Sequence, residues 1–138
     1  MLTIRRLDAT DAHRMIEGAA AKAQEIGVPM CIAITDEGGN LIAFERMDGG
    51  KVTSITIAID KSYTASAAKK ATHEYGEISQ PGKPAYGIDS AIGGRLMVVG
   101  GGLPVFAGGD VVGGIGVSSG TPAEDREVAQ AGIDALGL

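Results

Sequence analysis

The sequence has no tryptophan and few other aromatic residues, with two phenylalanines and three tyrosines among 138 residues. The hydrophobic residues, 44% of the chain, are therefore mainly alanine, isoleucine, valine, leucine and methionine, and these must build the core. A single cysteine, Cys31, excludes an intrachain disulfide and any zinc site built on a cysteine cluster. Because Cys31 lies in the apolar run 28–35, we expect it to be a small buried hydrophobic residue.

Positive charge is also scarce, since 12 lysines and arginines face 17 aspartates and glutamates and the net charge is −5. Nucleic-acid binding needs clustered positive charge, so we expect no nucleic-acid partner. No apolar run approaches the ~20 residues of a membrane span, and we expect no membrane partner. The first residues, MLTIRRLDAT, lack the apolar stretch of a signal peptide, which makes the cytoplasm the expected location.

The length of 138 residues predicts one domain over residues 1–138. A stripe of apolar residues between Ala12 and Ile26 predicts a first helix, capped by Asp8 or Thr10 and ended by Gly27. The apolar runs 29–35 and 41–45 flank a turn and predict a β-hairpin.

A second helix is expected from Thr53 or Ser54, and a last one after the capping box that begins at Thr121. Three more strands are expected at 95–99, 104–106 and 110–118, and an irregular loop at 76–94. The order α-β-β-α-β-β-β-α predicts an α/β fold of the α+β kind, with about five antiparallel strands flanked by helices.

Glycine is abundant, and half of the 22 glycines lie in residues 93–120. This stretch contains neither a complete G-x-x-x-x-G-K-[ST] loop nor a complete G-x-G-x-x-G fingerprint, which argues against a phosphate-binding loop. Gly108 and Gly109 are typical of a hairpin turn. Glycines inside the following strand, Gly113, Gly114 and Gly116, predict a bulge or the close approach of another backbone or a flat ligand.

Four segments together resemble the HbpS/GlcG-like haem-binding family: FERMD at 44–48, IAIDKSYTA at 57–65, QPGKPAYG at 80–87 and the glycine-rich run 93–120. The likeness covers nearly the whole chain and extends to the C-terminal domain of corrinoid adenosyltransferases of the PduO type. It implies a profilin-like fold, assembly into a homo-oligomer, and binding of haem or another tetrapyrrole such as a corrinoid. The family's secreted branch includes a haem-degrading sensor, and the present chain departs from that branch because it shows no secretion signal.

A haem site needs an axial donor beside an apolar slot and cations for the propionates. His13, early in the first helix beside Arg14, is the candidate iron ligand, although solvation alone also explains a histidine on a polar helix face. His73, expected at the end of the second helix, is a second candidate, or a favourable partner for the helix C-terminus. Tyr86, in the irregular loop, is a third candidate donor.

A second candidate site is an anion clamp formed by Arg46 and Lys61 beside the turn that contains Gly101. Lys61 lies in a helix of apolar and small residues, where a lysine either snorkels or is paired. The bland alternative is therefore a structural ion pair, with Asp48 as the expected partner, or a bridge between subunits.

Two functions stay open at this point. One is a binding module for haem or another tetrapyrrole that forms a homo-oligomer. The other is an accessory protein or small enzyme of glycerol, diol or glycolate metabolism that holds a small anionic substrate. No nucleophilic triad is recognisable, so the sequence leaves open whether the chain catalyses a reaction.

Overall fold

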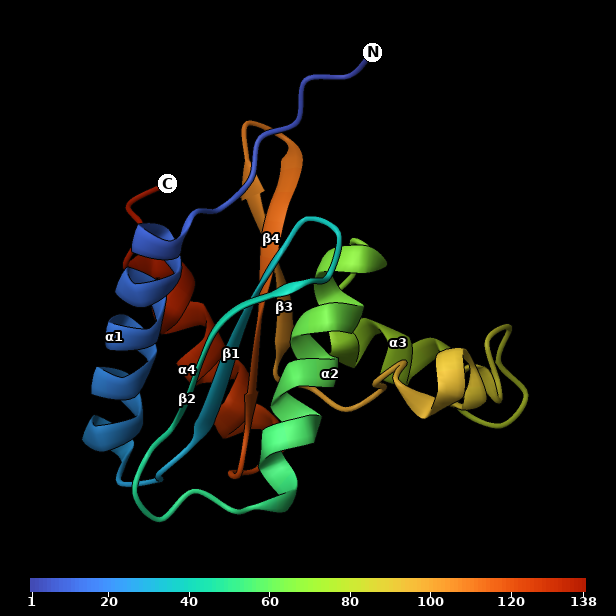
Figure 1. The fold of residues 1–138 in the computed structure, drawn as a ribbon. Helices are drawn as coiled ribbons and strands as arrows, with labels where there is room; N and C mark the ends of the chain where they lie inside the picture. Colours follow the sequence, from blue (N-terminus) through green and yellow to red (C-terminus); the bar gives the residue numbers. More distant parts are fainter.

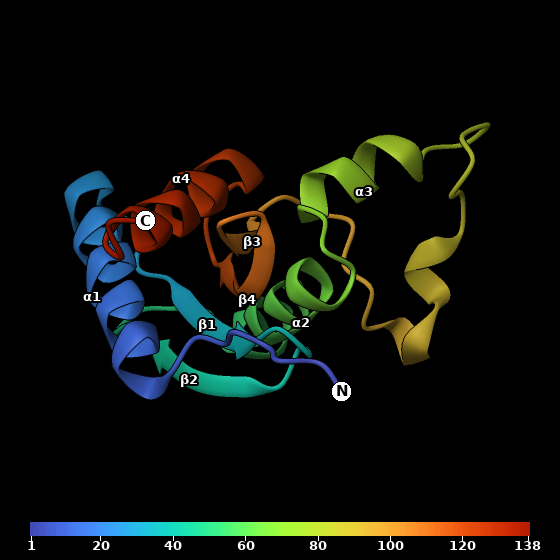
Figure 2. The ribbon, with the colours of Figure 1, turned by 90° about the horizontal axis from the view of Figure 1, so that it is seen from above.

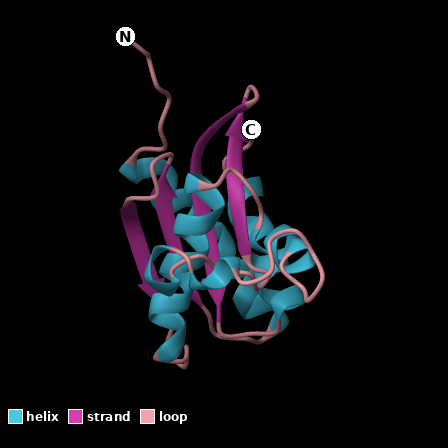
Figure 3. Cartoon of the chain, turned by 90° about the vertical axis from the view of Figure 1, so that its right-hand side faces the viewer, coloured by secondary structure: helices cyan, strands magenta, loops and turns pink.

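A four-stranded antiparallel sheet with helices on both faces organises the computed structural model, which describes all 138 residues (Figure 1). The strands follow the order β2-β1-β4-β3 and lie side by side in Figure 3. Their bounds are β1 (Cys31–Asp36), β2 (Leu41–Arg46), β3 (Gly102–Ala107) and β4 (Asp110–Ser118). The helices are α1 (Ala9–Ile26), α2 (Thr53–Ala67), α3 (Thr72–Ile78) and α4 (Pro122–Asp134).

The two faces of the sheet carry side chains of very different size. Ile32, Ile34, Ile115 and Val117 point to the face covered by α1 and α4 and belong to the main core. The alternate positions on β1 and β4 that point to α2 carry only small side chains, namely Cys31, Ala33, Thr35, Gly114, Gly116 and Ser118. Because these side chains are small, the backbone of α2 comes directly against β4. The close approach expected from the strand glycines is confirmed at Gly114 and Gly116, and the approaching backbone is that of α2. Gly113 instead faces Leu7, and the β3–β4 register shifts beside it, which matches the alternative expectation of a bulge.

Local signals at the helix ends are confirmed. Asp8, not Thr10, caps α1 by accepting a hydrogen bond from the Asp11 backbone N–H, and Gly27 ends the helix in the left-handed conformation. Thr121 caps α4 and forms the expected capping box with Glu124. Both hairpins are also present, β1 with β2 and β3 with β4.

The prediction of five strands is wrong, because residues 95–99 do not join the sheet. Two backbone groups in this segment contact the side-chain hydroxyl of Thr64 instead of a neighbouring strand. This hydroxyl accepts from the Met97 N–H at 3.0 Å and lies 3.1 Å from the Arg95 carbonyl. The observed order is therefore α-β-β-α-α-β-β-α, with two short 3₁₀ turns after α3.

The additional helix, α3, is separated from α2 by a turn in which Lys69 adopts the left-handed conformation, with a φ of +56°. His73 consequently lies in the first turn of α3 rather than at the end of α2. This change of place matters for the site, because it turns His73 towards the start of β3.

Residues 79–94, here named the arm, project from the body of the molecule beside α3 (Figures 1 and 2). The arm contains only the two 3₁₀ turns, Ile88–Ser90 and Ile92–Gly94. The irregular loop expected over 76–94 is therefore confirmed from residue 79 on, whereas residues 76–78 form the end of α3. At the foot of the arm Arg95 pairs with Asp60 at 3.0 Å and lies 3.9 Å from the centre of the Tyr63 ring. None of the helices is long and apolar enough to cross a membrane.

Candidate functional site

A shallow depression lies where α3, the segment leading into β3 and the start of α4 meet. Its volume is about 500 Å³, and we name it the His73 depression. It is lined by one histidine, an apolar wall, glycines and two polar side chains, namely His73, Val98, Val99, Pro122, Gly76, Gly100, Glu77 and Gln80. The wall and the histidine come from segments that are separated by more than twenty residues in the sequence and are joined only by the fold.

The imidazole of His73 is the unusual group in this depression. Its Nδ1 atom is shut off from solvent and has no hydrogen-bond partner, and no other buried side-chain nitrogen or oxygen in the protein lacks one. Such unsatisfied atoms are rare in folded proteins and call for a functional or structural reason. Nε2 makes no hydrogen bond to the protein and is left as the ring nitrogen that reaches solvent. A half-buried imidazole with one free nitrogen is a suitable ligand for a transition metal or a haem iron.

The surroundings of His73 suit a flat apolar ligand better than a small anion. Val99 is 43% exposed although it is apolar, and Pro122 adds a second apolar surface. The one charged residue in the lining, Glu77, is negative. Carboxylate groups of a ligand would therefore extend past the rim and away from Glu77.

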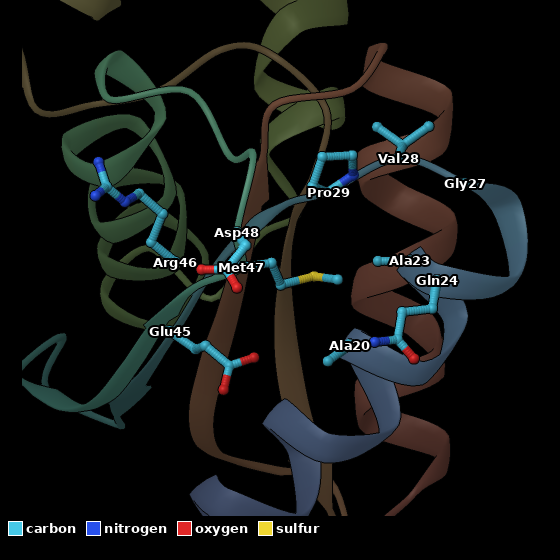
Figure 4. A pocket seen from close by; sticks show the side chains of 10 residues that line it. All are labelled: Ala20, Ala23, Gln24, Gly27, Val28, Pro29, Glu45, Arg46, Met47 and Asp48. Carbon is cyan, nitrogen blue, oxygen red and sulfur yellow. The ribbon is translucent and has the colours of Figure 1, made fainter.

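A second hollow, of about 520 Å³, lies between the C-terminal end of α1 and the end of β2 (Figure 4). Arg46 extends away from α1 towards the side of α2, whereas Met47 extends towards α1. The sulfur of Met47 already accepts a hydrogen bond from the Met30 N–H at 3.4 Å. With no histidine, tyrosine or cysteine in its lining, this hollow offers no free donor to a haem iron.

Lys61 is buried, with 1% of its surface exposed, and its ammonium group has partners inside the protein. Its Nζ lies 2.9 Å from the Asp125 carboxylate and donates to the Val117 carbonyl at 2.9 Å. The prediction of Asp48 as its partner is wrong, because the start of α4 brings Asp125 to the lysine while Asp48 stays exposed. Burial lowers the pKa of Lys61 and raises the pKa of Asp125, and the attraction between the two charges opposes both shifts.

Gly101 explains how this pair fits inside the protein. Its φ is +124°, and a Cβ at this position would lie 2.9 Å from Lys61 Nζ and 2.8 Å from the Asp125 Cβ. The structure thus brings Lys61 and Gly101 together, as expected, but Lys61 is buried against Asp125 whereas Arg46 is exposed. An anion clamp would require Lys61 to leave Asp125.

The two other candidate donors lie apart from the His73 depression. His13 is exposed on α1, and Tyr86 is 70% exposed in the arm. These elements lie on opposite sides of the molecule (Figures 1 and 2). Neither residue lines the depression, and no group of three or more histidine, cysteine, aspartate or glutamate side chains could hold a metal ion.

Comparison with known proteins gives this site its context. A family model described as "Haem degrading protein HbpS-like" matches residues 7–134. The chain belongs to the HbpS-like family. The resemblance expected from the sequence is therefore confirmed.

Two relatives within the HbpS-like family illustrate its range. An uncharacterized 15.0 kDa protein of Citrobacter freundii, from the dhaT-dhaS intergenic region, is 42% identical over 89% of this chain and 87% of its own length. The corrinoid adenosyltransferase PduO of Salmonella typhimurium is 34% identical over 93% of this chain. The chain spans only 38% of that enzyme.

Solved structures agree with the fold of this HbpS-like chain. The Klebsiella pneumoniae protein ORFY superposes with a TM-score of 0.97 at 33% identity, covering 100% of this chain and 95% of that one. A structure described as a PduOC–haem complex superposes with a TM-score of 0.90 at 35% identity, covering 94% of each chain. That relative therefore binds haem on the same fold.

Proposed function

We propose that this chain binds haem or a closely similar tetrapyrrole and that Nε2 of His73 would hold the iron. The observation that carries the proposal is the His73 ring, whose Nδ1 is buried without a partner while Nε2 is left free. The haem complex of a relative with 35% identity supports the same ligand class.

The residues around His73 fit a flat macrocycle that lies against the apolar wall. Covering the exposed part of Val99 removes apolar surface from water, which favours binding. A haem bound there would supply an iron centre, and the chain's own residues bind it, orient it and exclude water from one face. The lining holds no lysine or arginine to pair with the propionates, and its one charged group is Glu77, so the propionates would have to be solvated outside the depression.

A haemin titration followed by visible absorption tests this proposal. We expect a saturable Soret band in the wild-type chain that is lost or clearly shifted in His73→Ala. His13→Ala and Tyr86→Phe are the matched controls, because each removes a candidate donor outside the depression, and both should leave the band unchanged.

Other outcomes of the titration would assign the site differently. A band lost only in His13→Ala would move the ligand to α1 and overturn the role of His73. The absence of any band would remove haem as the ligand. Thermal-shift measurements with small carboxylates and phosphates would then test the accessory role in glycerol, diol or glycolate metabolism.

We also propose that the chain forms a homo-oligomer. The arm exposes large apolar side chains, with Tyr86 at 70% and Ile92 at 54% exposure, and the single chain leaves them uncovered. Light scattering coupled to size-exclusion chromatography should give a mass that is a multiple of 14.0 kDa. A monomer at all concentrations would contradict this assembly.

A further inference from the structure

His73 follows a threonine whose side chain is entirely buried. Thr72, the first residue of α3, has 0% of its surface exposed. Its Oγ1 accepts a hydrogen bond from the Gly102 N–H at 2.9 Å and lies 3.5 Å from the Gly102 carbonyl. One hydroxyl thus contacts both backbone groups of the residue that opens β3.

This contact leaves little freedom between α3 and the sheet. A Cβ on Gly102 would lie 2.5 Å from the Thr72 Cγ2 atom and 2.6 Å from the Lys61 carbonyl. The glycine therefore allows the threonine to approach β3 closely enough for the hydrogen bond. On the same stretch of chain, a methyl group added at Gly100 would lie 3.5 Å from the His73 Cβ, which is an ordinary contact distance.

We infer that Thr72 is a positioning residue for the His73 imidazole: its hydroxyl fixes the start of α3 against β3 and thereby sets the direction of Nε2 in the depression. This inference rests on the proposed function for its effect on haem binding. Groups that hydrogen-bond a metal ligand directly contribute about tenfold to a hundredfold in metal affinity. Thr72 acts on His73 through the start of α3 and not by such a bond, so we expect an effect at the lower end of that range.

The chain offers a matched control for the loss of a buried threonine hydroxyl. Thr35, on β1, is also 0% exposed, and its Oγ1 lies 2.8 Å from the Ser62 hydroxyl and 3.0 Å from the Ser66 hydroxyl. These contacts join β1 to α2 and do not involve α3 or the depression. Thr35→Val should therefore lower stability without moving His73.

Two readouts on Thr72→Val, Thr72→Ser and Thr35→Val test the inference, all at a temperature where far-ultraviolet circular dichroism shows each variant folded. The first is the haemin dissociation constant and Soret position. Thr72→Val should weaken haemin binding about tenfold and shift the Soret band, whereas Thr72→Ser and Thr35→Val should match the wild type.

The second readout needs no haem. The chain has two histidines, so the ring ¹H–¹³C signals of His73 can be assigned by their loss in His73→Ala. We expect these signals to move in Thr72→Val and to stay in place in Thr72→Ser and Thr35→Val. If the His73 ring signals shift in Thr72→Val but the wild-type chain binds no haemin, the positioning role holds and the proposed function fails. If they stay in place in Thr72→Val, or move equally in Thr35→Val, the positioning role is overturned.

Discussion

Gly116→Ala should destabilise the chain by about 3 kcal/mol or more, the upper range for overpacking a well-packed interior. A methyl group at this position would lie 2.0 Å from the Ala58 carbonyl oxygen and 2.4 Å from the Ser62 backbone nitrogen. Both atoms belong to the backbone of α2, so no change of rotamer can relieve the contact. The helix would have to move off the sheet, and with it the residues that it contributes to the interior.

Far-ultraviolet circular dichroism during urea unfolding measures this effect, and the absence of tryptophan makes it preferable to fluorescence. Gly100→Ala is the control, because an added methyl there meets its nearest neighbours at 3.5 Å, an ordinary contact distance. Its stability should stay close to that of the wild type. Equal midpoints for Gly116→Ala and the wild type would show that α2 is not held against β4 as described.

Removing either member of the Lys61–Asp125 pair should cost about 3–5 kcal/mol, since the remaining charge would be buried without its partner. Lys61→Met leaves the Asp125 carboxylate with one hydrogen bond, from the Gly120 N–H at 2.9 Å. Asp125→Asn leaves the Lys61 ammonium among neutral groups. The double variant Lys61→Met/Asp125→Leu should regain most of the loss, because a buried ion pair is often replaceable by apolar residues of similar size.

The Asp125→Asn variant should also change how stability depends on pH. Burial lowers the folded-state pKa of Lys61 below its ordinary value of 10.5, and without the carboxylate the attraction that opposes this shift is lost. Between the folded-state pKa and 10.5 the unfolded chain binds more protons than the folded one, so stability rises with pH. The free energy of unfolding of Asp125→Asn, relative to the wild type, should therefore increase as the pH rises towards the ordinary lysine pKa of 10.5. A difference that is constant with pH would contradict a buried, charged Lys61.

Features encoded by neighbouring residues were predictable from the sequence. Asp8 and Thr121 cap helices through residues three positions away, and both hairpins follow from apolar runs around short turns. The strand predicted at residues 95–99 is wrong because an apolar run of strand length does not reveal whether a partner strand is available. The backbone of these residues is bound instead by the side chain of Thr64 on α2, which is far away in the sequence.

Long-range contacts were beyond local pattern reasoning. The sequence predicted that Lys61 either snorkels or is paired, but not that Asp125 would be its partner. Likewise, His73 was a candidate donor, whereas its buried Nδ1 and its support by Thr72 depend on where α3 meets β3. The sequence shows a threonine directly before the candidate histidine, but its contact with β3 can be seen only in the structure.

The strand order has a consequence for how the chain acquires its structure. Each hairpin closes over a short turn, but the pairing that joins them, β1 with β4, brings Cys31 opposite Ser118. The entropy of closing this long loop is lost before the pairing contributes any stability, and non-local pairing of this kind slows folding. During synthesis, β1 has one edge unpaired until β4 has left the ribosome. In that interval the β1–β2 hairpin, rather than the finished sheet, is the species most exposed to aggregation.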